Sequence, residues 1–204
     1  DGISLIQTAE GALNETHNIL QRMRELSVQG ANDTNVSVDR TAIETELKQL
    51  TSEIDRISSQ TQFNKQSILA NTSKVNIQVG ANSKQAITIS LKTMSSSGLG
   101  ITAASLKVTN TSSANTLTDV LDKAIEKVST HRSDLGALQN RLEHTISNLN
   151  NTSENLTAAE SRVRDVDMAK EMMNFSKNNI LQQAAQAMLA QANQQPQGVL
   201  QLLR

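Results

Sequence analysis

Apolar residues recur at helical spacing along most of the chain, and in the first third they predict two helices. Over residues 1–30 one apolar series repeats every seven residues and a second follows one position later, as in a helix with a wide apolar face. Over residues 37–59 the apolar residues are separated by gaps of four and three. We expect Gly30 to end the first helix, because glycine adopts a left-handed cap at little steric cost, and Ser37 to cap the second.

The longest pattern predicts a third helix over residues 117–163. Its apolar rows alternate by four and three residues without a slip as far as residue 166, and a sustained heptad of this kind is a coiled-coil seam. One row contains polar positions such as His131, which lower stability and help to fix the register. The other row forms the main seam: Leu121, Val128, Leu135, Leu142, Leu149 and Leu156.

Over residues 63–101 the spacing of apolar residues changes from a helical period to a period of two. Apolar and polar residues alternate over 75–79 and again over 87–91, which predicts two half-buried strands joined as a hairpin. The sequence therefore indicates a mainly α fold: an elongated antiparallel helical bundle or coiled-coil rod, with a small β-hairpin region and a C-terminal helical segment.

Past residue 166 the heptad phase breaks while the helical apolar pattern continues. We expect residues 1–165 to form a core domain and residues 166–204 a separate C-terminal segment. Two interpretations of this segment stay open: an adaptable Met-rich binding surface, or a helix packed on its own core. Its candidate binding residues are Met168, Met172, Met173, Phe175, Ile180, Leu181, Ala184, Met188, Leu189, Val199, Leu200, Leu202 and Leu203.

Composition and charge remove several function classes. Lys and Arg number 19 against 20 Asp and Glu, so no basic excess is available to bind nucleic acid. Absence of cysteine excludes thiol catalysis and cysteine-ligated metals. No apolar stretch is long enough to insert across a membrane, and neither a zinc-protease motif, a phosphate-binding glycine loop nor a nucleophile elbow occurs. We expect no enzyme activity, no catalytic or metal-binding residues and no cofactor.

Several blocks of sequence are recognisable: residues 1–13 (DGISLIQTAEGAL), 20–26 (LQRMREL), 60–64 (QTQFN), 159–167 (AESRVRDVD), 189–196 (LAQANQQP) and the terminal LLR. These blocks resemble bacterial flagellin, most closely the short flagellins of Gram-positive type. The family's N-terminal segment is lacking from this sequence, and because the sequence starts inside a helical pattern we expect further residues upstream of Asp1.

The resemblance implies a structural subunit that polymerises with itself into the flagellar filament and serves motility. It implies a secreted, extracellular protein, cytoplasmic before export by type III secretion as a client of a flagellar export chaperone that binds the C-terminal segment. It further implies an assembly regulator that senses flagellin near Asn155, and a Toll-like receptor of animal hosts that contacts Arg22, Leu26 and Glu46. The alternative from another class is a helical adaptor that binds partners without polymerising.

Overall fold

The structure is a computed structural model that describes residues 1–164 and 167–202, with side chains described as far as residue 193. It divides into two compact units, Asp1–Leu149 (unit 1) and Asn150–Arg204 (unit 2). The elements are α1 (Gly2–Gly30), α2 (Ser37–Gln60), β1 (Gln62–Phe63), β2 (Gln66–Ser67), β3 (Ser73–Gln78), β4 (Ala86–Leu91), α3 (Ser96–Leu99), α4 (Thr111–Arg164) and α5 (Met168–Leu202). The predicted mainly α fold with a small β-hairpin region is confirmed.

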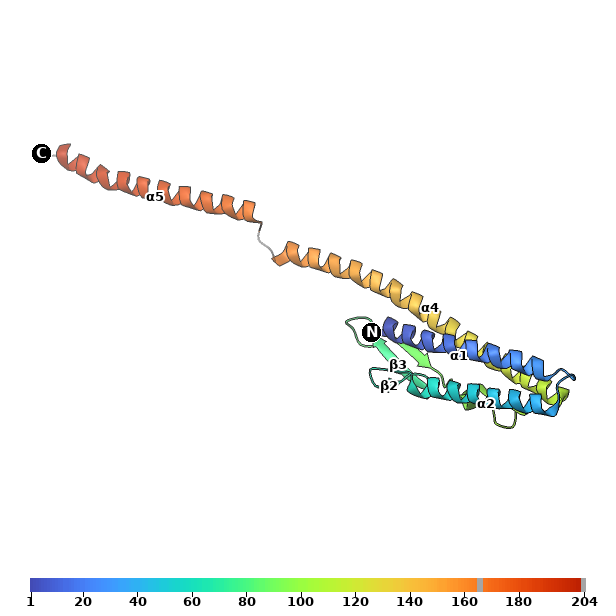
Figure 1. Ribbon diagram of the computed structural model, residues 1–204. Helices are drawn as coiled ribbons and strands as arrows, with labels where there is room; N and C mark the ends of the chain where they lie inside the picture. The colour runs from blue at the N-terminus through green and yellow to red at the C-terminus, as the bar shows by residue number, and fades with distance from the viewer. Residues whose placement is uncertain (165–166, 203–204) are drawn as a thin grey trace. The chain divides into compact units, whose positions relative to one another are not determined.

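In unit 1, α1 and α2 and the first part of α4 lie side by side (Figure 1). Helix α4 runs antiparallel to α1: Arg132 of α4 pairs with Glu10 at 2.7 Å, and Asp122 accepts from Arg24 Nε at 2.6 Å. Nearer the start of α4, the hydroxyl of Ser27 donates to the carbonyl oxygen of Ala114 at 2.9 Å. These pairs fix one register along α1, and its apolar rows form one continuous core with those of α2 and α4.

Two of the expected helix caps differ from the prediction. Gly30 is the last residue of α1, but Ala31 after it keeps a right-handed backbone. Position 30 needs glycine because of the space available, since a Cβ atom on Gly30 would lie 2.5 Å from Val108 Cγ1. The N-cap of α2 is Val36 rather than Ser37, and the carboxylate of Asp39 accepts from the Val36 amide at 3.2 Å.

The alternating segments pair as an antiparallel hairpin, as the sequence predicts. Strand β3 pairs with β4 in a register that places Val75 opposite Ile89. In β4 every second residue is buried, namely Ile87, Ile89 and Leu91, which follows from the two-residue period of a strand covered on one face.

The structure also contains small elements that the sequence analysis did not predict. Strands β1 and β2 form a second, shorter hairpin with Phe63 opposite Gln66. The single turn of α3 is held by α2, because Ser96 donates to the carboxylate of Asp55 from both its amide and its hydroxyl, each at 2.8 Å.

Candidate functional site

The heptad seam of α4 is buried for only part of its length. Leu121, Val128 and Leu135 are fully buried and Leu142 nearly so, whereas Leu149 is 41%, Leu156 65% and Val163 90% exposed. The change coincides with the first turn of α1, where a Cβ on Gly2 would lie 3.4 Å from the Leu142 side chain. Residues of the same sequence pattern are therefore part of the core up to Leu142 and form an exposed apolar stripe after it.

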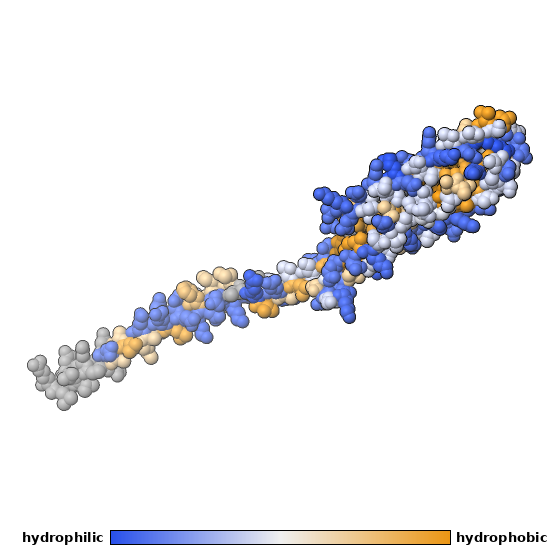
Figure 2. Space-filling model, turned by 90° about the horizontal axis from the view of Figure 1, so that it is seen from below, coloured by the Kyte–Doolittle hydropathy of each residue, from blue (hydrophilic) through white to orange (hydrophobic). Residues whose placement is uncertain are grey.

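Helix α5 exposes its apolar side chains. The large ones described, from Met168 to Leu189, are 56–70% exposed, Ala184 is exposed as well, and orange residues show along this helix in Figure 2. Within unit 2 itself, the described residues of α5 form no core of their own. The side chains of Val199, Leu200 and Leu202, and Leu203 as a whole, lie outside the described residues.

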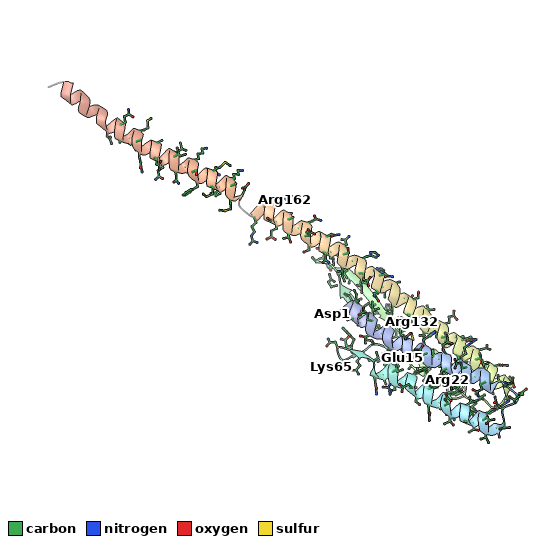
Figure 3. All side chains as sticks on the ribbon, turned by 45° about the horizontal axis from the view of Figure 1, so that its top comes forward. Asp1, Glu15, Arg22, Lys65, Arg132 and Arg162 are labelled. Carbon is green, nitrogen blue, oxygen red and sulfur yellow. The ribbon has the colours of Figure 1, made fainter. Side chains whose placement is uncertain are left out.

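An ion pair joins α1 to α2 at two of the expected receptor-contact positions. Arg22 donates to one carboxylate oxygen of Glu46 from Nη2 at 2.9 Å and from Nε at 3.1 Å. The hydrogen bond to Glu46, followed by that to Glu25, raises the pKa of the Arg22 guanidinium. Arg22 lies on the surface of unit 1 (Figure 3). Leu26, the third position, is buried in the helix core and presents almost no surface to a partner.

Asn155, the expected regulator position, is exposed on α4 in unit 2. It lies on the same exposed turn of helix as Leu156, whose apolar side chain continues the seam. The structure thus places a polar amide next to the uncovered part of the stripe.

His131 is the buried polar residue of the seam. Its side chain is fully buried, and neither ring nitrogen has a hydrogen-bond partner. Burial lowers the pKa of the imidazole, with a smaller effect in the same direction from Lys92, while Asp134 and Glu10 oppose it. Burial therefore favours the neutral ring, and a fully buried ring is not a ligand in an accessible site.

The sequence analysis did not single out two surface features of unit 1. Val28, Val36 and Val38 are exposed around the turn between α1 and α2, and Phe63 lines a groove at the far end of the unit. A signal for the first was present in the sequence, since three valines surround a run of turn-forming residues at 31–35. The groove had no signal in the sequence, because its lining comes from α1 and both hairpins.

Among the described residues, no cluster of His, Asp and Glu side chains is arranged to hold a metal ion. The helices in this part of the chain also include none that is long and apolar enough to cross a membrane.

Comparisons with known proteins agree with the resemblance seen in the sequence. The family model for the bacterial flagellin N-terminal helical region matches residues 1–74, and that for the bacterial flagellin C-terminal helical region matches residues 118–203. Flagellin from Halalkalibacterium halodurans is 59% identical over all of this chain and 75% of its own length. Flagellin from Bacillus subtilis is 51% identical over all of this chain and 78% of its own length.

A solved structure gives the same result for the fold. The crystal structure of Bacillus cereus flagellin superposes with a TM-score of 0.62 at 34% identity, covering 78% of this chain and 92% of that one. The resemblance and the assignment to a non-enzymatic class are both confirmed. This chain belongs to the bacterial flagellin family, the structural subunits of the extracellular flagellar filament.

Proposed function

We propose that this chain works in the filament through the apolar side chains left exposed after Leu142, and that an export chaperone covers α5 before assembly. The observation that carries the proposal is the uncovered apolar surface of α5 and the last part of α4. Large exposed apolar surfaces usually mark a partner site. In the filament, neighbouring copies would bury these side chains, each contributing roughly 1.5–3 kcal/mol when fully buried.

The breadth of the apolar surface on α5 favours contact with more than one helix. Apolar residues occur there as adjacent pairs: Met172 with Met173, Ile180 with Leu181, and Met188 with Leu189. Adjacent residues point about 100° apart on a helix, so each pair spans more than a single coiled-coil stripe. A helix that is apolar over much of its circumference is stable in water only when several neighbours cover it.

Charge supports the same proposal. No Asp, Glu, Lys or Arg occurs between Lys177 and Arg204. Burial of this stretch therefore requires no charge to leave water, whereas an isolated buried charge is costly. The asparagine and glutamine side chains that separate the apolar ones can hydrogen-bond to neighbouring helices. An apolar surface of this kind has to be shielded from water while the protein is cytoplasmic. Docking of α5 into a groove of a chaperone would bury it before export.

We place the functional boundary between the core domain, 1–165, and the C-terminal segment, 166–204. Within the core domain we propose two further partners. A flagellin-sensing regulator would contact the exposed surface around Asn155. A Toll-like receptor of an animal host would contact the exposed Arg22 and Glu46 pair, with Leu26 acting from the core by holding α1 in place.

Substitution in α5 tests the proposal. Ile180→Asp should prevent polymerisation and weaken chaperone binding about tenfold or more, because a carboxylate would have to be buried in either complex. Ile180→Met is the matched control and should behave like the wild type. Polymer is measured by sedimentation and electron microscopy, and chaperone affinity by calorimetry.

Two results would contradict the proposal. Equal polymerisation and equal chaperone affinity of Ile180→Asp and Ile180→Met would show that α5 makes neither contact. A wild-type protein that binds the chaperone and forms no polymer under any assembly condition would favour the adaptor function instead.

A further inference from the structure

The six methionines of the chain differ in burial between the two units. In unit 1, Met23 is fully buried and Met94 is 3% exposed. The other four all lie on α5, and we call them the α5 methionines. They are 56–70% exposed: Met168, Met172, Met173 and Met188. The core therefore shields the thioethers of unit 1, whereas those of α5 are open to reagents in solution.

This distribution concentrates the oxidisable side chains of the protein on one helix. The sequence contains no cysteine, tryptophan or tyrosine, so methionine supplies all of its sulfur. Oxidation adds one oxygen to the thioether and converts a flexible apolar side chain into a polar one. A mild oxidant therefore finds its accessible sulfur on α5 and not in the core of unit 1.

Two of the α5 methionines belong to a local apolar patch. Met172 and Met173 line one hollow of the helix surface. The lining also includes the apolar side chains of Ile180 and Leu181 and the cation of Lys177. Adjacent residues point about 100° apart on a helix, so the two thioethers cover a wide arc. A partner helix on either side of this arc contacts a sulfur.

Packing by itself does not require methionine at these positions. Leucine is a volume-conserving replacement with a similar helix propensity, and it cannot form a sulfoxide. Most core positions of unit 1 are in fact occupied by leucine, isoleucine or valine. Four methionines on the exposed helix give its surface a chemical reactivity that leucine would lack.

We propose that the α5 methionines are an oxidant-sensitive modification site, at which a peroxide blocks the contacts of α5. The proposal rests on the filament and chaperone functions above, because those contacts bury these side chains. Each sulfur attacks one peroxide oxygen with a lone pair, so that an S–O bond forms and the O–O bond breaks. Sulfur loses two electrons to the departing oxygen. The hydroxide so released takes the proton of the transferred hydroxyl and leaves as water.

A sulfoxide opposes the burial of α5. Its oxygen requires a hydrogen-bond partner when it leaves water, and the apolar side chains of Ile180 and Leu181 provide none. Oxidised chains are therefore excluded from the filament and from the chaperone, while unit 1 stays folded around its buried methionines. Assembly covers the same sulfurs and protects them. Sulfoxide reductases restore the thioether, so the block is reversible while a chain is unassembled.

Peroxide treatment of the whole chain tests the site. Unassembled wild-type protein is exposed to hydrogen peroxide, which is then removed, and sulfoxides are mapped by peptide mass spectrometry. The α5 methionines should each gain one oxygen before Met23 or Met94 reacts, and those in preformed polymer should stay reduced. The critical concentration for polymerisation should rise about tenfold or more, and chaperone affinity measured by calorimetry should fall by a similar factor. Incubation with sulfoxide reductases should reverse both changes.

Leucine variants separate the α5 sulfurs from other targets of peroxide. The variant that combines Met168→Leu, Met172→Leu, Met173→Leu and Met188→Leu should have the same critical concentration before and after treatment. The matched control combines Met23→Leu with Met94→Leu and should respond to peroxide as the wild type does. Thermal melts by circular dichroism verify that the variants and the treated proteins keep unit 1 folded.

The outcomes separate the modification site from the filament function. Equal oxidation of α5 and core methionines in folded protein would overturn the proposal, as would unchanged assembly of wild type with all α5 sulfoxides formed. An equal loss of assembly in the four-leucine variant would place the damage elsewhere and overturn it too. Failure of untreated wild type to polymerise would instead overturn the filament function, and the chaperone affinities of treated and untreated protein would then decide on the site.

Discussion

At the scale of single residues, His131 shows how one position can conflict with its surroundings. The heptad places it in a fully buried row of α4, and its two ring nitrogens find no partner there. An unpaired buried polar group costs roughly 1–3 kcal/mol. Burial also favours the neutral ring and lowers its pKa, so this residue couples folding to pH.

His131 should make unit 1 less stable in mild acid. Because the folded-state pKa lies below the unfolded value of about 6.5, the unfolded chain binds more protons at mildly acidic pH. Stability therefore rises with pH in that range. The contribution of the neutral ring is complete above about pH 6.5 and is lost as the pH falls toward the folded-state pKa.

Urea unfolding of the wild type and of His131→Leu at pH 5 to 7 measures this contribution. The variant should be more stable at pH 7 by about 1 kcal/mol, and the difference should widen toward pH 5. His144→Leu, at an exposed position, is the control for removing a histidine. Parallel pH profiles of His131→Leu and the wild type would mean that the buried ring does not titrate on unfolding.

At the scale of elements, α4 gives one sequence pattern two outcomes. Its seam leucines are equivalent in the heptad, yet Leu135 is fully buried and Leu156 is exposed. The difference lies in whether another helix faces the seam. Hence the stability that a seam residue contributes depends on the helix that faces it and does not follow from the sequence of α4 alone.

In the unpolymerised protein, Leu135→Asp and Leu156→Asp should have different effects on the melting temperature. A carboxylate at position 135 would be buried without a partner, at a cost of several kcal/mol. The melting temperature should fall by about 10 °C or more. The same change at position 156 should move it by less than about 2 °C, as for an exposed site. Similar melting temperatures for the two variants, measured by circular dichroism, would contradict the assignment of core and exposed seam.

At the scale of the whole molecule, the two units have different sources of stability. Unit 1 has a continuous core drawn from helices α1 to α4 and the β3–β4 hairpin. In unit 2 the described large apolar side chains are exposed. Isolated helices are marginal in water because most helical stability comes from tertiary packing. Unit 1 should therefore fold by itself, whereas α5 should gain its stability from partners.

Removal of residues 150–204 should leave the melting temperature of unit 1 within about 2 °C of the wild-type value, because its core is intact. The same truncation should abolish polymerisation. Removal of residues 111–149 from the truncated chain is the contrasting change, since it deletes the seam that covers α1, and it should abolish cooperative unfolding. A melting temperature more than about 5 °C lower after the first truncation would show that unit 2 stabilises unit 1.

The sequence by itself determined the long helices, the β3–β4 hairpin and the family. These follow from local periods: apolar residues at heptad spacing, as in Leu121 to Leu142, and at every second position, as in Ile87 to Leu91. Such periods reflect the geometry of one element and need no knowledge of its neighbours. The apolar, uncharged character of the stretch after Lys177 is equally visible in the sequence.

Tertiary structure alone decided which of these patterns is covered. Leu142 and Leu149 occupy the same seam position one heptad apart, and only the presence of α1 beside the first makes it core. Gly30 is required for the approach of Val108 from a distant loop, and the groove draws Leu5, Phe63 and Ile77 from three elements. Burial depends on which segments meet in space, because apolar surface is stabilised only by what removes it from water.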